Sequence, residues 1–594
     1  GVVYMAGNHI FRTIDEGASW EIISPDLTRN DVTKQQASGG PITKDATAVE
    51  YYCTVFAFVE SPHEPGVFMA GSDDGLVHLS RNNGETWNDI TPPDLPEWTL
   101  ISIIEPSPHD AATFYIAATR YKMDDTRPCL YKTKDYGKHW TKIINGIPDN
   151  DFTRVIREDP GRRGLLYAGT ETGVYVSFDD GSVWQPLQLN LPVVPIHDLV
   201  VKDSDLVAAT HGRSFWILDD LTPLRQIAAG LVDSPSYLFQ PRPTYRFPVR
   251  RGFWAGGLNG RNYERGDGPL VFTYNQSIGP NGQTVRRMLD AGDDLDDGVM
   301  VFYYLKDKPE GDVTVDFLDG DGEVIRQFRS SSEDTKERPS AREDLRVPKE
   351  PGMNRFTWDM RYPGAHRISG DESTTGFGST IAGPMVLPGM YEVQLNVNGE
   401  ISAQRFEIRM DPRITSTQGD LKAQFDLLIQ IRNKLSETHD SINKLRSIRK
   451  KLDSCLRQVE DLNTGRLEST GIPRRRPTTL IARIAELTIN ELVAVEETLT
   501  NIPISDAGQA STGSQAVGPQ SGLSQQAKLN AKLASLNVVV AKSDDRPTQQ
   551  SYAVFDELSK RVDQQLRKLK TIFDKDVKEF NERWTKHPEL RHPL

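Results

Sequence analysis

Two pairs of neighbouring aspartates are the candidate carboxyl groups for hydrolytic chemistry. Asp73 and Asp74 stand directly before a glycine, and Asp124 and Asp125 lie in a loop that begins near Tyr121. Two carboxyl groups about 6.5–9.5 Å apart across a cleft can hydrolyse a glycosidic bond with inversion, because one protonates the leaving group while the other activates a water. Asp-Gly beside a strand is also typical of a turn, and a turn is the favoured interpretation here.

Aromatic side chains are the second group of candidates. Trp98, Tyr121 and Trp254 lie in loop-like contexts outside any repeated motif. An exposed Trp or Tyr ring can stack on the face of a sugar. The three residues are therefore candidate ligand contacts, although packing in the core or anchoring of a loop is the favoured interpretation for each.

An acidic run at 290–297 is the one stretch with enough carboxylates for a calcium ion. Its candidate ligands are Asp293, Asp294, Asp296 and Asp297. The run lacks the twelve-residue ligand spacing of a recognised calcium loop, so a solvated turn is favoured. The three cysteines are far apart and no H-E-x-x-H motif occurs. We therefore expect no metal and no cofactor.

Length and charge narrow the classes of function. The chain has 594 residues, enough for about four domains, or fewer if one is a large all-β unit. It carries 70 Lys and Arg against 83 Asp and Glu, and this net charge of −13 argues against binding to nucleic acid or anionic lipid. No apolar run reaches the roughly 18–20 residues of a membrane span. The chain begins with Gly-Val-Val-Tyr, so we expect any export signal to lie outside it.

A repeated motif organises the first third of the chain. The pattern S/T-x-D/N-x-G-x-x-W occurs at 13–20, 80–87, 133–140 and 177–184. Hydroxyl and Asx side chains bond local backbone groups, glycine accepts a positive φ, and Trp covers the adjoining sheet, which is the chemistry of a structural hairpin and not of catalysis. The motif positions are Asp15, Gly17, Trp20, Asn82, Gly84, Trp87, Asp135, Gly137, Trp140, Asp179, Gly181 and Trp184.

The spacing of the motifs predicts a β-propeller. Each copy follows one apolar strand and precedes another, at intervals near the roughly 40–50 residues of a four-stranded blade. A last unit at 196–218 has the strands without the motif. Residues 1–230 are therefore expected to form about five blades, of which the first is incomplete.

The repeats resemble the Asp-box, or BNR, repeats of sialidases, sortilins and tandem-propeller xyloglucanases. The whole chain resembles the large bacterial sortilin-like or BNR-repeat "glycosyl hydrolase" proteins, in which propellers precede a β-sandwich and a helical segment. A propeller of that kind has six to eight blades, so the resemblance implies that further blades come from another polypeptide or were cut away. The Arg-Ile-Pro of sialidases and the cysteine-rich module of sortilins are not found.

Two further regions follow the repeats. Residues 231–412 contain short alternating strands separated by Gly, Pro and Asp, which predicts an antiparallel sandwich, and its layout is similar to immunoglobulin-like domains of bacterial surface proteins. Residues 413–594 form a helical region with a flexible Gly, Ser and Gln linker at 503–524.

Heptad spacing predicts helices that pack together. Leu428, Leu435 and Ile442 recur every seven residues, and Leu445 and Leu452 continue on a neighbouring stripe. This pattern predicts a long helix from about Thr415. Two more helices are expected at 478–500, with Leu480, Ile484, Leu487 and Leu492 on one face, and at 550–584. The three helices would form a bundle that leaves part of the stripe free for another subunit.

These patterns predict a multidomain, mainly β protein that is secreted or associated with the bacterial cell envelope. We expect it to bind or scaffold other molecules, with propeller loops recognising a glycan, peptide or protein and with the helices docking a partner. The alternative is a glycoside hydrolase acting in a cleft between tandem propellers, and a second alternative is a sortilin-like peptide receptor.

Overall fold

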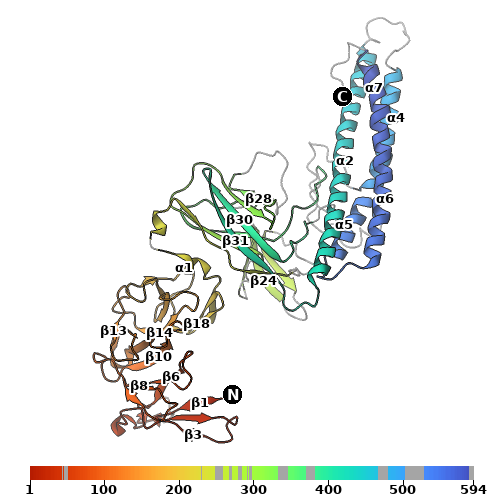
Figure 1. Ribbon diagram of the computed structural model, residues 1–594. Helices are drawn as coiled ribbons and strands as arrows, with labels where there is room; N and C mark the ends of the chain where they lie inside the picture. Colours follow the sequence, from red (N-terminus) through yellow and green to blue (C-terminus); the bar gives the residue numbers. More distant parts are fainter. Residues whose placement is uncertain are drawn as a thin grey trace. The chain divides into compact units, whose positions relative to one another are not determined.

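The computed structural model describes most of the chain as two compact units, Gly1–Ala228 and Ala229–Leu594 (Figure 1). The described residues are 1–42, 44–45, 51–228, 230–247, 259–265, 271–278, 284–289, 292, 297–331, 345–369, 382–465, 479–501 and 527–586. Trp254, the expected linker at 503–524, and Asp293, Asp294 and Asp296 of the acidic run lie outside them.

The first unit consists of five antiparallel sheets that follow one another along the chain. Sheet 1 contains β1 (Val3–Ala6), β2 (Ile10–Thr13) and β3 (Glu21–Ile22), and sheet 2 contains β6 (Val55–Glu60), β7 (Phe68–Ser72), β8 (Val77–Ser80) and β9 (Asn88–Asp89). Sheet 3 contains β10 (Leu100–Pro106), β11 (Phe114–Arg120), β12 (Asp125–Thr133) and β13 (Thr141–Lys142). Sheet 4 contains β14 (Thr153–Glu158), β15 (Leu166–Thr170), β16 (Val174–Ser177) and β17 (Gln185–Pro186), and sheet 5 contains β18 (Ile196–Lys202), β19 (Asp205–Thr210) and β20 (Phe215–Leu218).

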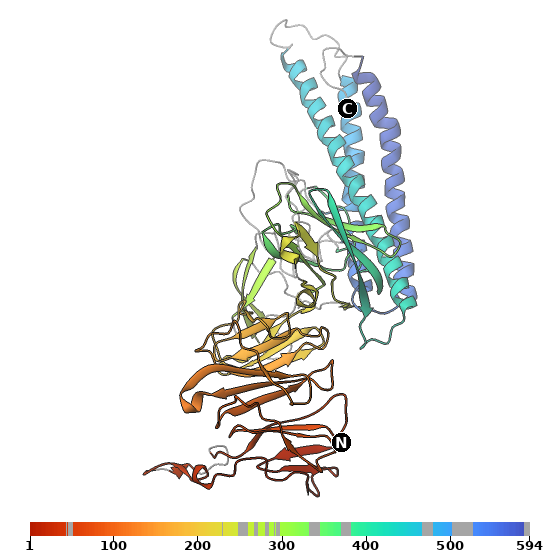
Figure 2. The same ribbon diagram turned by 60° about the vertical axis from the view of Figure 1, so that its left-hand side comes forward.

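Smaller elements complete this unit. They are the hairpin β4 (Ser38–Gly39) and β5 (Lys44–Asp45), the 3-10 helices η1 (Val32–Lys34) and η3 (Tyr121–Met123), and α1 (Thr222–Gln226). Figure 2 shows the five sheets stacked in sequence order, with the first and the fifth at opposite ends. The sheets therefore form an open, propeller-like arc and not a closed ring.

Burial follows the position of each sheet in the arc. All five residues of β7 and all five of β15 are buried, because the inner sheets pack between two neighbours. Each end sheet has a neighbouring sheet on one face only. Met5 in sheet 1 is therefore 54% exposed, and Phe215 in sheet 5 is 73% exposed. The arc ends on each side in an exposed apolar sheet face.

The four copies of the repeated motif form the turns that lead into the last strands of sheets 1–4. In sheet 3, Thr133 Oγ1 accepts a hydrogen bond from the amide of Gly137 at 3.0 Å, and Asp135 Oδ1 accepts one from the amide of His139 at 2.9 Å. The other three copies repeat both bonds at the same positions. The motif aspartates thus act on backbone groups of their own turns.

The motif tryptophans attach each sheet to the preceding one. In sheets 2, 3 and 4 the indole Nε1 donates to a backbone carbonyl of the sheet before it, at 2.9, 2.7 and 2.7 Å. The three pairs are Trp87 with Ile23, Trp140 with Ile90, and Trp184 with Ile143. Trp20 belongs to the first sheet, which has no sheet before it in the described chain, and it is 42% exposed.

The motif glycines allow a direct test of this attachment. Gly84 and Gly17 occupy the same motif position with φ of +90° and +92°. A Cβ on Gly84 would lie 2.6 Å from the carbonyl oxygen of Ile23, whereas a Cβ on Gly17 would meet nothing closer than 3.9 Å. Gly84→Ala should therefore lower the free energy of unfolding of the first unit by about 2–5 kcal/mol, and Gly17→Ala by only the conformational part of about 1–2 kcal/mol. Urea denaturation measures both, and equal losses would contradict the proposed sheet contact.

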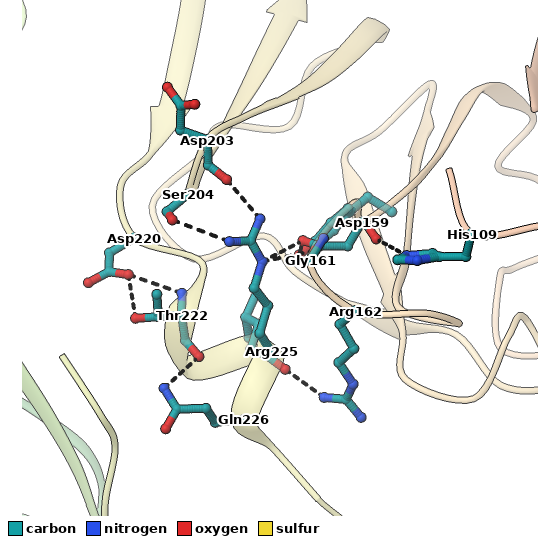
Figure 3. A network of polar contacts seen from close by, with 12 residues as sticks. His109, Asp159, Gly161, Arg162, Asp203, Ser204, Asp220, Thr222, Arg225 and Gln226 are labelled. Carbon is teal, nitrogen blue, oxygen red and sulfur yellow. Dashed lines mark hydrogen bonds and ion pairs between the residues drawn. The ribbon is translucent and has the colours of Figure 1, made fainter. Parts of the chain in front are cut away.

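An ionic network fixes α1 to sheets 4 and 5 (Figure 3). The Arg225 Nε donates to both carboxylate oxygens of Asp159, at 2.8 and 3.1 Å, and its Nη2 donates to the carbonyl of Asp203 at 2.9 Å. Asp159 also accepts a hydrogen bond from the amide of Gly161 at 2.7 Å and from the hydroxyl of Tyr167 at 3.1 Å. The carboxylate is fully buried, so these donors replace its hydration.

The second unit begins with a β-sandwich. One sheet contains β21 (Ser236–Leu238), β26 (Val299–Leu305) and β29 (Gly352–Trp358), and the facing sheet contains β22 (Thr244–Arg246), β31 (Glu400–Met410), β30 (Gly389–Val397), β27 (Val313–Leu318) and β28 (Val324–Arg329). A separate sheet contains β23 (Gly260–Arg265), β24 (Val271–Ile278) and β25 (Thr284–Met288), and η4 (Leu231–Asp233) precedes them all. The two facing sheets share one core, in which Phe317 stacks on Trp358 with ring centroids 4.3 Å apart.

The helices of the second unit form a bundle. They are α2 (Gln418–Gly465), α4 (Thr479–Leu499), α5 (Leu529–Val540), α6 (Gln549–Thr571), the π-helical turn η5 (Ile572–Val577) and α7 (Lys578–Trp584). The stripe residues Leu428, Leu435, Ile442, Leu445 and Leu452 are all buried in the bundle core. The expectation that part of this stripe stays free for another subunit is therefore wrong, because helices of the same chain cover it. None of the described helices is long and apolar enough to cross a bilayer.

Two features of the bundle differ from the sequence prediction. The structure adds α5, whose buried face carries Leu529, Leu533, Leu536 and Val540 at helical spacing, together with Asn530 and Asn537. In α4, Leu480 and Leu487 are 51% and 56% exposed. The stripe of buried residues begins one position later, at Ile481. Spacing alone does not fix which stripe faces the other helices.

Candidate ligand-binding face

The connections at one end of sheets 2–5 form a surface that we name the loop face. Adjacent strands in each sheet are antiparallel. The connection between the second and third strands therefore lies at the same end of the sheet as the connection to the next sheet. The motif turns lie at the opposite end. The loop face consists of the β7–β8, β11–β12, β15–β16 and β19–β20 connections and of the residues that lead into β6, β10, β14 and β18.

A β-bulge lies at the start of the first strand of each of these sheets, next to the loop face. The pairing register shifts at Phe56, Ser102, Arg154 and His197, which occupy equivalent positions in sheets 2–5. A bulge leaves the extra residue unpaired and re-aims its side chain, and bulges are frequent beside binding sites. Phe56 is accordingly 62% exposed.

Aromatic rings and lysines cluster on the loop face near sheets 1–3. Tyr52 and Trp98 meet edge to face with ring centroids 5.4 Å apart. The Nζ atoms of Lys122 and Lys34 lie 5.8 Å from the ring centroids of Tyr52 and Trp98 respectively. Met123 contacts the Tyr52 hydroxyl through its Sδ at 4.0 Å and is 45% exposed. Partly exposed rings beside cations suit a ligand that combines apolar groups with negative charge.

Tyr121 begins a second cluster, which extends across sheets 3 and 4. Its ring stacks on Phe152 with centroids 5.1 Å apart and an interplanar angle of 17°. The Arg154 guanidinium lies 5.5 Å from the centroid of the Tyr121 ring and donates through Nε to Glu171 at 2.8 Å. Tyr121 remains 41% exposed, so the neighbouring groups orient the ring without covering it.

Two histidines extend this second cluster into sheet 5. His197 and His211 stack with ring centroids 4.8 Å apart. Burial, reinforced by the positive charge of Arg154, lowers the pKa of His197, which favours the neutral ring at physiological pH. His197 therefore offers hydrogen-bonding groups to the loop face in its neutral form.

Asp73 and Asp74 lie at the loop face but bind backbone groups. Asp73 Oδ1 accepts hydrogen bonds from the amides of Cys53 and Thr54, both at 2.9 Å. Asp74 is fully buried, and its Oδ2 accepts a hydrogen bond from the amide of Arg29 at 2.8 Å. Burial raises the pKa of Asp73 to about 6. These bonds hold the neighbouring loops in place, which favours a structural role for both carboxyl groups.

Asp124 and Asp125 occupy different environments. Asp124 is exposed and ends η3 with a φ of 57°. Asp125 forms ion pairs with Arg127 at 2.8 Å and with Arg120 at 3.2 Å. The hydrogen bond from Arg127 holds the pKa of Asp125 well below its usual range. A carboxylate that stays ionised so strongly is a poor donor or acceptor of protons near neutral pH.

Trp98 and Tyr121 belong to the loop face, as their loop contexts suggested, but Tyr52 and Phe56 escaped the sequence analysis. Arg154 is interpreted from the sequence as a solvated loop cation, whereas the structure places it beside Tyr121 and Glu171. In sheets 2–4 two adjacent apolar residues follow the bulge and interrupt the alternation of the strand, so an alignment of these first strands would have indicated it. Among the described residues, no group of three or more His, Cys, Asp or Glu side chains is placed to hold a metal ion. Of the four aspartates considered for calcium, only Asp297 is described.

No protein-family model and no curated protein sequence matches this chain. Among solved structures, YCF48 bound to D1 peptide is similar at 18% identity and a TM-score of 0.22, over 28% of this chain and 51% of that one. The GH74 xyloglucanase from Xanthomonas campestris is 13% identical over 68% of each chain, with a TM-score of 0.30. The ancestral GH74 enzyme AFV00434 is 16% identical over 68% of this chain and 44% of its own length, with a TM-score of 0.27. Similarities at this level carry neither ligand nor activity over to the chain.

Proposed function

We propose that this chain is a binding protein that recognises a partner polypeptide through the loop face. The observation that supports the proposal is the group of partly exposed apolar side chains on that face, drawn from separate sheets and set among cations. Aromatic residues, Met and Arg are the residue types enriched in protein interfaces. The group consists of Tyr52, Phe56, Trp98, Tyr121 and Met123.

The rest of the chain has a supporting role in this proposal. We take the protein to be secreted or associated with the cell envelope and the sandwich to be immunoglobulin-like. A docking role for the helices would use the exposed side chains Leu480 and Leu487 of α4, because the buried stripe of α2 is not available.

The glycoside hydrolase alternative depends on one residue. Asp73 has a pKa of about 6, which suits a proton donor, although two backbone amides hold one of its oxygens. The other candidate carboxyl groups fit the chemistry less well, since Asp74 is fully buried and Asp125 is held in its ionised form by arginine. Binding is therefore the function that the geometry supports best.

Selection from a random-peptide display library tests the proposal on the full chain. Peptides enriched on the wild-type protein should bind Tyr121→Ala at least tenfold more weakly, because an anchoring ring contributes about 1.4 kcal/mol or more at the centre of an interface. Trp20→Ala is the matched control: Trp20 is 42% exposed, close to the 41% of Tyr121, but belongs to a motif turn at the opposite end of the sheets.

The same experiment separates the two functions. Equal loss of binding in Tyr121→Ala and Trp20→Ala, or no enriched peptide at all, would contradict recognition by the loop face. Release of reducing sugar from a β-glucan by the wild-type protein, abolished in Asp73→Asn, would instead support the hydrolase.

A further inference from the structure

A pocket of about 290 Å³ lies between sheets 3 and 4, at the end of the sheets that carries the motif turns. In sheet 3 its walls come from the β10–β11 turn, β11 and the motif turn, and in sheet 4 from the end of β14, the β14–β15 turn and the motif turn. The volume is just below the roughly 300–1,000 Å³ of pockets for drug-sized ligands. The pocket therefore suits a small ligand or a single side chain, and it is separate from the loop face.

Glu158 contributes a buried carboxyl group to the wall of this pocket. The residue is 3% exposed, and its Oε1 accepts a hydrogen bond from the amide of Gly164 at 2.9 Å. Its Oε2 is buried as well and has no hydrogen-bond partner among the described residues. Because a buried carboxylate oxygen without a partner is costly, Glu158 favours a ligand that donates hydrogen bonds.

The cations around the pocket are already bonded to other groups. Lys132 and Lys134 both form ion pairs with Asp180, at 3.0 and 2.8 Å. The Nη2 of Arg163 donates to a backbone carbonyl of the β10–β11 turn at 2.6 Å. Four carboxyl groups line the pocket against these three cations, so one negative charge is left in excess. The ligand that fits this balance is positively charged.

The hydroxyl of Tyr115 adds a hydrogen-bond acceptor beside Glu158. It donates its single hydrogen to Asp180 Oδ1 at 2.9 Å, so it cannot also donate to Glu158, and its lone pairs can accept. Burial, together with the negative charges of Glu158 and Asp180, raises the pKa of Tyr115, so the hydroxyl stays protonated. A ligand in the pocket therefore meets acceptors on both Glu158 and Tyr115.

The next pair of sheets shows which group the chain itself places against a buried carboxylate of this kind. Tyr167 is the second residue of β15, as Tyr115 is of β11. The Tyr167 hydroxyl donates to Asp159 at 3.1 Å, and the guanidinium of Arg225 binds the same carboxylate (Figure 3). Between sheets 4 and 5, a guanidinium thus accompanies a buried carboxylate and the equivalent tyrosine.

We infer that the pocket between sheets 3 and 4 binds a guanidinium group of a ligand, held by Glu158 and Tyr115. A guanidinium presents five N–H donors in a planar fork that matches a carboxylate. A metal ion fits less well, because no group of three or more His, Cys, Asp or Glu side chains in the described part of the chain is placed to coordinate one. The group belongs either to a small free molecule or to an arginine side chain of another polypeptide.

Isothermal titration calorimetry of the full chain with methylguanidine tests the inference. Binding should be saturable, and methylurea, a neutral molecule of nearly the same shape, should bind at least about tenfold more weakly because it lacks the charge. The amide of N-acetyl-arginine distinguishes the two sources. Affinity equal to or higher than that of methylguanidine indicates an arginine side chain, and lower affinity indicates a small free molecule.

Glu158→Gln keeps the size of the side chain but removes its charge, and it should weaken the binding of methylguanidine by about tenfold or more. Glu60→Gln is the matched control. Glu60 Oε1 accepts a hydrogen bond from the amide of Gly66 at 2.9 Å, just as Glu158 Oε1 does from Gly164, but Glu60 is exposed and lies in sheet 2. The control should leave the affinity within about twofold of the wild-type value.

Asp110→Asn provides a second variant in case Glu158→Gln does not fold. Asp110 lines the pocket with its side chain 43% exposed, and an asparagine can still accept the hydrogen bond that Asp110 Oδ1 accepts from the amide of Ala112 at 2.8 Å. Loss of this more exposed charge should weaken the binding of methylguanidine by about two- to fivefold. Binding of methylguanidine that does not saturate, equal binding of methylurea, or unchanged affinity in the pocket variants would overturn the inference.

Discussion

Replacing Leu435 with Asp should unfold the helical bundle while the sheets of the first unit keep their own melting transition. Leu435 is fully buried in the bundle core. The substitution loses the packing of a large apolar side chain, about 2–5 kcal/mol, and adds the cost of a carboxylate without partners. We expect the free energy of unfolding of the bundle to fall by about 5 kcal/mol or more, which circular dichroism of the helices and calorimetry of the full chain would detect.

The control for this prediction uses the same chemistry at an exposed helical site. Leu487 in α4 is 56% exposed, so Leu487→Asp should change the free energy of unfolding by no more than about 0.5–1 kcal/mol. Ile442, which is also fully buried, should behave like Leu435. If Leu435→Asp and Leu487→Asp melt at the same temperature, the stripe of α2 is not the core of the bundle.

The bundle illustrates what residue spacing predicts and what it leaves open. The recurrence of Leu428, Leu435 and Ile442 every seven residues identifies one face of a long helix, and these residues are buried. Spacing does not say what covers the face, and here the covering helices belong to the same chain. It also leaves the exact stripe of α4 undefined, because Leu487 and Leu492 belong to neighbouring stripes and only the position of the other helices decides between them.

In the sheets, too, local contacts can be predicted from the sequence, whereas long-range contacts cannot. The motif fixes its own turn through contacts over four residues, so the sequence alone shows where Thr133, Asp135 and Gly137 act. The bond from Trp140 to Ile90 spans 50 residues, and no local pattern specifies that partner.

Residue type also leaves the role of a carboxyl group open. Asp73 and Asp125 look alike in sequence, yet burial raises the pKa of Asp73 and hydrogen bonding to Arg127 lowers that of Asp125. Their surroundings differ: Asp73 is held by Cys53 and Thr54 from a distant segment, whereas Asp125 bonds to Arg127 two residues along the chain.

Arg225→Met should destabilise the first unit by about 3–5 kcal/mol. The substitution leaves the carboxylate of Asp159 fully buried without its charged partner, and removing one member of a buried pair has an effect of this size because the remaining charge cannot be hydrated. The bonds from Gly161 and Tyr167 remain but carry no full positive charge. Figure 3 shows that the same guanidinium also reaches Asp203 and Ser204, so α1 and sheet 5 should loosen together.

Lys202→Met is the appropriate comparison, since Lys202 forms its ion pair with Asp203 at 3.2 Å while both side chains are more than 70% exposed. Water and salt screen such a pair, and its loss should change the free energy of unfolding by less than about 1 kcal/mol. Urea denaturation followed by tryptophan fluorescence measures the free energy of unfolding of both variants.

The double variant Asp159→Ala with Arg225→Met should lose less free energy of unfolding than the sum of the two single variants, because neither charge is then left without its partner. Additive losses, or an Arg225→Met variant as stable as Lys202→Met, would mean that the buried pair does not hold α1 against the sheets.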